Sequence, residues 1–196
     1  MDIKKYYKNK KKGFTLVETL IAIAILVVAV LAPLAIAQSG LQGARYAQDQ
    51  LTAIFLAQEA VELVKSQVYS NMNETPPVDW LRYLNDGSPA DCITRDCEVS
   101  GPRPTDQSAG LPIRECIAGA NACKVYLDTG SNLYTSSFTG DTQTKFTRAI
   151  RLTPIAAPTP LNTQEKVTVT VTWKAQDGTS KNYALSDHIT NWYSGL

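Results

Sequence analysis

One carboxylate stands alone in the most apolar part of this chain. Glu18 is the only ionisable side chain between Phe14 and Ala37. A carboxylate within an apolar helix costs on the order of 2.5–3.5 kcal/mol at the centre of a bilayer, and less near its surface. Glu18 is therefore a functional-site candidate that needs a positively charged partner. The plainer alternative is a glutamate that enters the membrane at headgroup level and has no role.

The residues that must position Glu18 form a candidate membrane-spanning helix. From Leu20 to Ala37 the chain holds eighteen residues without a charged or polar side chain. Extended back to Phe14, the segment would reach about 36 Å as an α-helix, more than the roughly 30 Å of a bilayer's hydrocarbon core. A buried core helix fits poorly because the segment has no polar face. A cleaved signal peptide is also a weaker interpretation, since helix-compatible sequence follows Ala35–Ala37.

Charge is distributed unevenly along the 196 residues. The first thirteen residues carry six lysines and one acid, Asp2. Of the 19 basic and 18 acidic residues of the chain, 13 and 17 therefore follow Gly13. Lysines beside an apolar helix stay in the cytoplasm, which predicts that the C-terminal part lies outside. Apolar rather than aromatic and basic residues follow the lysines, so we expect no direct nucleic-acid binding.

The residues around Glu18 also form a candidate processing site. The stretch Lys11-Lys12-Gly13-Phe14-Thr15-Leu16-Val17-Glu18 resembles the cleavage and N-methylation site of type IV prepilins. In that family a peptidase cuts a basic leader after its final glycine, and the new N-terminal residue, commonly Phe, is methylated. The resemblance implies a leader of residues 1–13, cleavage between Gly13 and Phe14, and N-methylation of Phe14 by a prepilin peptidase/methyltransferase.

The same resemblance supplies a partner and a role for Glu18. Cleavage would create a cationic amine at Phe14, about four residues from Glu18 along the helix, so the two groups could pair within one chain. As the resemblance implies, Glu18 would neutralise the N-terminus of a neighbouring subunit during filament assembly.

Pro33 removes a backbone donor within the helix and is predicted to kink it, either with a role in the filament or as a tolerated irregularity.

Beyond the membrane segment the sequence predicts an amphipathic helix and a globular head. Residues 38–68 carry apolar side chains at three- and four-residue steps, Leu51 and Phe55 among them. Residues 69–196 form the predicted head, which is irregular to about Ala122 and then reads as antiparallel strands. The clearest strand is Lys166–Lys174, where valines and Trp173 alternate with a row of threonines that is predicted to face solvent.

The predicted fold class is therefore α+β. A long N-terminal helix, with a transmembrane first half (14–37) and an amphipathic second half (38–68), packs on a C-terminal antiparallel β-sheet. An irregular region stapled by disulfides lies between them.

The irregular region holds all the cysteines. An even number in an exported segment argues for two disulfides, and three connectivities remain open. Pairing in sequence order is favoured because it closes short loops. The spacings match zinc sites poorly, and we predict neither a metal nor a cofactor. The residues concerned are Cys92, Cys97, Cys116 and Cys123.

The sequence contains no catalytic constellation that we recognise. No glycine-rich phosphate loop follows a predicted strand, and the sole histidine, His188, has no evident nucleophile partner. Two oxygen-rich stretches, Asp128–Asn132 and Asn85–Gly87, are explained better as turns than as calcium sites. We therefore predict that the protein is not an enzyme.

The prediction that combines these features is a structural subunit of a type IV pilus-like filament, either a minor pilin or a pseudopilin of a type II secretion or DNA-uptake system. Its predicted partners are the prepilin peptidase/methyltransferase, the inner membrane, and other pilin subunits through the N-terminal helix. Its N-terminus would lie in the cytoplasm and its head outside, before entry into a filament. The alternative is a single-pass anchored adhesin or ligand-binding ectodomain that never polymerises.

Overall fold

In the residues that the structure describes, the fold combines one long helix with one sheet. The computed structural model describes residues 13–76, 78–85, 91–99, 113–116, 122–136, 141–155 and 164–192. The chain divides into two compact units, residues 1–45 and 46–196. The helix α1, Leu16–Met72, contributes to both units. Of the predicted leader, only Gly13 belongs to the described residues.

The first unit is the apolar part of α1. All of its side chains from Leu16 to Arg45 are exposed. Among the described elements, α1 is the one helix long and apolar enough to cross a membrane, and none of its most apolar eighteen-residue stretch is buried. Pro33 lies inside the helix, which is assigned without a break through that position. The large uncovered apolar surface needs lipid or another protein around it.

In the second unit, one face of α1 is buried. Its buried residues recur at three- and four-residue steps, which is the period of a helix packed on one side; they are Ala53, Leu56, Ala57, Ala60, Val61, Val64 and Val68. Leu51 and Phe55, which the sequence grouped with this stripe, are instead exposed on the helix. The helix ends at Met72, four residues beyond the predicted end.

The helix end is tied to the chain that follows it by Asn71. This side chain is fully buried. Its amide nitrogen donates to the carbonyl oxygens of Trp80, at 3.1 Å, and Arg82, at 2.8 Å. A buried amide needs such partners, so Asn71 holds the turn at 80–84 against the helix.

The sheet is built around the long strand β5, Thr142–Pro154. Along one edge, β5 pairs with β6, Gln164–Lys174, which pairs in turn with β7, Ser180–Thr190. β5 also pairs with two short strands, β1, Cys97–Val99, and β3, Lys124–Leu127. β1 pairs in turn with β2, Ile113–Glu115, and β3 pairs with β4, Tyr134–Thr135. All of these pairings are antiparallel.

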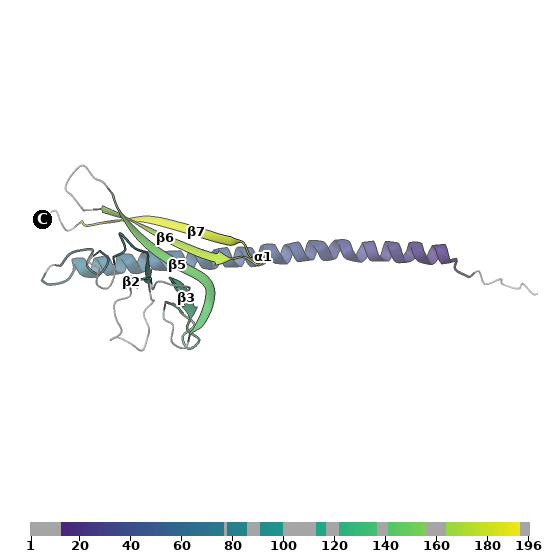
Figure 1. The fold of residues 1–196 in the computed structure, drawn as a ribbon, viewed down its shortest axis with the longest axis horizontal. Helices are drawn as coiled ribbons and strands as arrows, with labels where there is room; N and C mark the ends of the chain where they lie inside the picture. Colours follow the sequence, from purple (N-terminus) through teal and green to yellow (C-terminus); the bar gives the residue numbers. More distant parts are fainter. Residues whose placement is uncertain are drawn as a thin grey trace, which may run out of the picture. The chain divides into compact units, whose positions relative to one another are not determined.

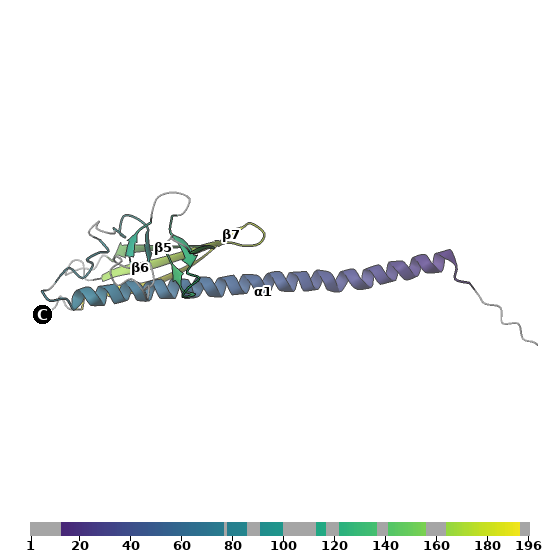
Figure 2. The same cartoon turned by 90° about the horizontal axis from the view of Figure 1, so that it is seen from below.

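The sheet covers one side of the second half of α1, as both ribbon views show (Figures 1 and 2). The inner row of β6 is fully or almost fully buried and faces the helix core, while the intervening threonines are only partly buried; the inner row comprises Val167, Val169, Val171 and Trp173. The turn from β6 to β7 contains Gly178, whose φ of 78° suits glycine. The predicted α+β class and the orientation of this strand are confirmed.

The region predicted to be irregular up to Ala122 contains two strands. β1 pairs with β2 through three residues and meets β5 through Cys97 and Ile150. Strands of three residues are too short to show an alternating pattern in the sequence. Their pairing depends on the long strand β5, which lies far away in the sequence, and local patterns could not reveal it.

Candidate functional site

The candidate processing site lies where α1 begins. Thr15 occupies the N-cap position: its Oγ1 accepts a hydrogen bond from the Glu18 amide at 3.2 Å. Threonine followed three residues later by glutamate is the sequence signature of a capping box, so this contact could have been recognised from the sequence. The helix thus starts just after the bond that the resemblance marks for cleavage.

The bond between Gly13 and Phe14 is accessible in this arrangement. Both residues lie outside the helix, and the Phe14 side chain is 79% exposed. A Cβ added to Gly13 would meet no atom within 4 Å. The chain's own packing therefore does not require glycine at this position, and a requirement for it would come from the peptidase.

Glu18 sits in the first turn of α1. Backbone N–H groups that lack helical partners give this end a partial positive charge, which favours a carboxylate. Phe14 and Glu18 are thus near each other along one helix start, while Pro33 lies fifteen residues beyond Glu18 and the cysteines belong to the second unit. Among the predicted residues of the first unit, the cleavage residues and Glu18 are neighbours along the chain, and in the second unit the cysteines pair with one another.

The comparison with protein families agrees with this geometry. Residues 8–32 match the prokaryotic N-terminal methylation motif, a stretch that includes Gly13, Phe14 and Glu18. The chain therefore carries the processing motif of type IV pilin-like prepilins. The motif is typical of pilins and pseudopilins, whose members are structural rather than enzymatic proteins and are processed by prepilin peptidase. An apolar N-terminal helix in a prepilin implies a location first in the inner membrane and then in a filament. No curated protein and no solved structure matches the chain.

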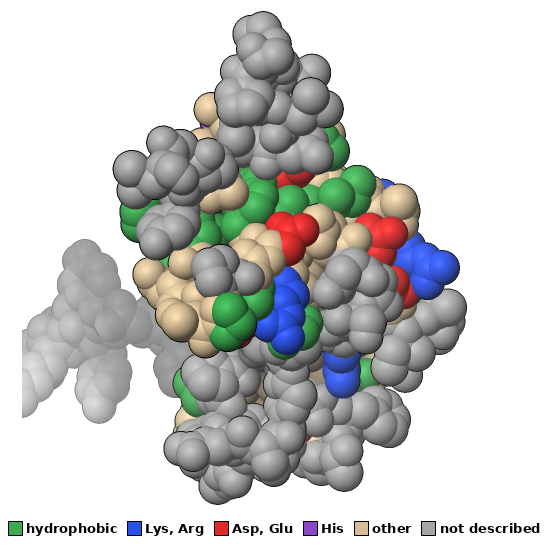
Figure 3. Space-filling model, turned by 90° about the vertical axis from the view of Figure 1, so that its left-hand side faces the viewer, with side chains coloured by type: hydrophobic (Ala, Val, Ile, Leu, Met, Phe, Trp, Pro, Cys, Tyr) green, Lys and Arg blue, Asp and Glu red, His purple; other side chains and the backbone are tan. Residues whose placement is uncertain are grey.

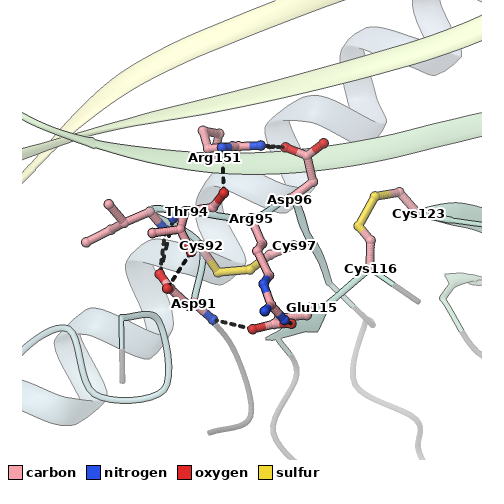
Figure 4. Close-up of a disulfide and its surroundings, with 11 residues drawn as sticks. Asp91, Cys92, Thr94, Arg95, Asp96, Cys97, Glu115, Cys116, Cys123 and Arg151 are labelled. Carbon is pink, nitrogen blue, oxygen red and sulfur yellow. Dashed lines mark hydrogen bonds and ion pairs between the residues drawn. A yellow bond between two sulfur atoms is a disulfide. The ribbon is translucent and has the colours of Figure 1, made fainter. Parts of the chain in front are cut away.

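In the pilin-like head the cysteines form two disulfides, Cys92–Cys97 and Cys116–Cys123. This is the pairing favoured from the sequence. Figure 4 shows the loop between Cys92 and Cys97 held against β5: Arg151 donates to the Asp96 carboxylate and to the Thr94 carbonyl oxygen. The Cys92–Cys97 bridge closes the loop that leads into β1, and the Cys116–Cys123 bridge joins the residue after β2 to the residue before β3.

The head also contains a buried cation that the sequence analysis did not single out. Arg148, on β5, is 2% exposed. Its guanidinium contacts the Glu59 carboxylate at 2.6 Å and the carbonyl oxygens of Leu56, at 3.1 Å, and Val99, at 2.8 Å. Burial lowers the pKa of Arg148, and the charge of Glu59 acts in the opposite direction. One side chain therefore joins α1, β5 and β1.

The remaining sequence candidates show local roles. Asp128 accepts hydrogen bonds from the Gly130 amide and the Ser131 hydroxyl, as expected for a turn. His188 is exposed on β7. In the second stretch, Asn85 forms a bridge with Asp91, whereas Asp86 and Gly87 lie outside the described residues.

Several charged side chains at the surface of the head form ion pairs. Arg82 contacts Glu74 at 2.8 Å, and Lys65 contacts Asp187 at 2.6 Å. Figure 3 likewise shows acidic and basic side chains side by side on one face. Mixed charge of this kind gives little long-range attraction for a polyanion.

Proposed function

We propose that this chain is a minor pilin or pseudopilin that is cleaved after Gly13, N-methylated at Phe14 and built into a type IV pilus-like filament. The observation that carries the proposal is the match of residues 8–32 to the methylation motif. The accessible Gly13–Phe14 bond and the uncovered apolar helix behind it support it further. The proposed machine is a pilus, a type II secretion system or a DNA-uptake system.

In the proposed precursor, lipid covers residues 14–37 and the lysine-rich leader stays in the cytoplasm. Residues 38–68 lead into the head, residues 69–196, outside the membrane. On assembly, apolar helices of neighbouring subunits replace the lipid around this segment. The exchange leaves Glu18 in a medium of low dielectric constant, where an unpaired carboxylate is costly and an ion pair is strong.

Cleavage supplies the missing cation. The new amine of Phe14 on an incoming subunit pairs with Glu18 of its neighbour, and the fixed positions of these two charges set the axial offset between subunits. A helix kink or local loosening at Pro33 would let the filament adjust. The role of a low-copy subunit is supported by the head, where the described residues of the cysteine-bearing part form short strands and two disulfides.

The pairing mechanism is tested by Glu18→Ala. We expect this variant to be cleaved and methylated normally but to enter filaments poorly, because the incoming amine lacks its counter-charge. Glu62→Ala is the matched control: Glu62 is an exposed acid on the same helix, and this variant should assemble normally. If Glu18→Ala were incorporated as well as the control, the pairing would be wrong. An anchored adhesin would show an uncut N-terminus and no dependence on Glu18.

A further inference from the structure

A hollow of about 290 Å³ lies between α1 and the connection from β3 to β4. Phe55 and Glu59 line it from the helix, Leu133 lines it from the connection, and Tyr134 lines it from the start of β4. Phe55 is 66% exposed and Leu133 is 47% exposed. Large apolar side chains gathered around a hollow mark an interaction site more often than a plain solvent face. We call this hollow the Phe55–Leu133 groove.

Two of the polar groups that line the groove already have partners within the chain. The Glu59 carboxylate is bound by Arg148 at 2.6 Å. The Thr52 hydroxyl donates to the Gln48 carbonyl oxygen at 3.0 Å. Such groups give little reason for a charged ligand to enter. The volume is at the lower limit for a small-molecule site, but it suits one or two aliphatic side chains presented by another protein.

The proposed filament supplies an occupant with this chemistry. Between Leu20 and Ala37 the chain is a run of uncharged, mostly aliphatic residues, and every side chain in it is exposed. Once such a helix leaves the lipid, its apolar surface must be covered by protein. Helices commonly dock into grooves through apolar anchors spaced by three or four residues.

We propose that the Phe55–Leu133 groove receives aliphatic side chains from the apolar N-terminal helix of an adjacent pilin-class subunit. This inference rests on the proposed filament function. It adds that the head, through the β3–β4 connection, takes part in covering a neighbour's membrane-derived segment. The contact is formed only on assembly, since in the membrane that segment is covered by lipid.

The contact is tested by placing a photo-crosslinking amino acid at Leu133 in the full chain and irradiating assembled filaments. Leu133 lies outside the named strands, so the replacement should not disturb the sheet. We expect the cross-linked peptide, identified by mass spectrometry, to come from the apolar segment of a neighbouring subunit. The same amino acid at Tyr69, which is 51% exposed on α1 and does not line the groove, should not capture that segment.

A cross-link from Leu133 to another head, or none in intact filaments, would overturn this inference and leave the filament proposal standing. A chain that retains its leader and never enters filaments would overturn the filament proposal itself. The two failures are thus distinguishable.

A charge variant gives an independent readout. Leu133→Asp would place a carboxylate against the incoming aliphatic side chains, which is costly without a partner. We expect incorporation into filaments to fall by roughly tenfold or more, with the thermal unfolding of the head unchanged. Tyr69→Asp should assemble as the unmodified chain does. Normal incorporation of Leu133→Asp would contradict the docking model.

Discussion

Arg148 and Arg151 stand three residues apart on β5 but serve opposite faces of the sheet. Arg148 is buried and contacts Glu59 of α1 at 2.6 Å. Arg151 is partly exposed and contacts Asp96, in the loop between Cys92 and Cys97, at 2.5 Å. β5 thus fastens the helix on one side and the cysteine-bearing loop on the other, and the two arginines form a natural pair for comparison.

Arg148→Met should destabilise the head more than Arg151→Met. Removing Arg148 leaves the buried carbonyl of Val99 and the half-buried Glu59 carboxylate without their donor, and we expect a loss of about 2–3 kcal/mol in the free energy of unfolding. Arg151 belongs to an exposed pair, so its loss should cost about 1 kcal/mol or less. Urea unfolding of the two purified variants measures the difference. Equal losses would contradict the role given to Arg148.

The two disulfides should differ in their resistance to reduction. Cys92 and Cys97 are fully buried, whereas Cys116 is partly exposed. Thiol–disulfide exchange requires access of the attacking thiolate to a sulfur atom. We predict that Cys116–Cys123 opens first in the folded protein when dithiothreitol is added stepwise. Alkylation of the released thiols followed by peptide mass analysis gives the order, and early alkylation of Cys92 would be the contrary result.

Glu165 should make the head less stable as pH rises. Its side chain is 2% exposed, and its Oε2 has no hydrogen-bond partner among the described residues. Burial raises the pKa of Glu165 above its ordinary value of 4.5. At pH values between the pKa of Glu165 in the unfolded state and its pKa in the folded state, the folded state therefore binds more protons than the unfolded state does. Stability is highest below the ordinary value and declines as pH rises toward the folded pKa.

Replacing Glu165 by Gln removes this charge at nearly constant shape. We expect Glu165→Gln to unfold at a higher temperature than the unmodified protein at pH 7 and at a similar temperature below pH ~4, where the carboxyl is protonated in both states. Burial also raises the pKa of Glu98. The decline of stability with rising pH should therefore become smaller in Glu165→Gln but not disappear. Glu62→Gln serves as an exposed control. An unchanged or lower unfolding temperature for Glu165→Gln at pH 7 would refute the assignment.

Sequence patterns predicted the parts of this fold that depend on local periodicity. The alternation through Val167 and Trp173 marked β6 and its buried face, and the apolar run up to Ala37 marked the first half of α1. The grouping of Phe55 with the buried stripe was wrong: its spacing fits a helix period, but its side chain is exposed and lines the Phe55–Leu133 groove.

Contacts between distant residues were beyond such patterns. The position of Arg148, in step with the apolar residues Phe146 and Ile150, signals that it points inward, but its partner Glu59 lies 89 residues away. The Phe55–Leu133 groove likewise joins residues from two remote segments. At the candidate site the reverse holds: the motif from Gly13 to Glu18 is short and contiguous, so the sequence alone could identify it.

Processing after Gly13 can be read from the intact mass and N-terminal sequence of the protein extracted from membranes or filaments of cells with an active prepilin peptidase. We expect a chain that begins at Phe14, lacks the thirteen residues before it and carries one methyl group on its N-terminal amine. A chain that still begins at Met1 in such cells would contradict this expectation.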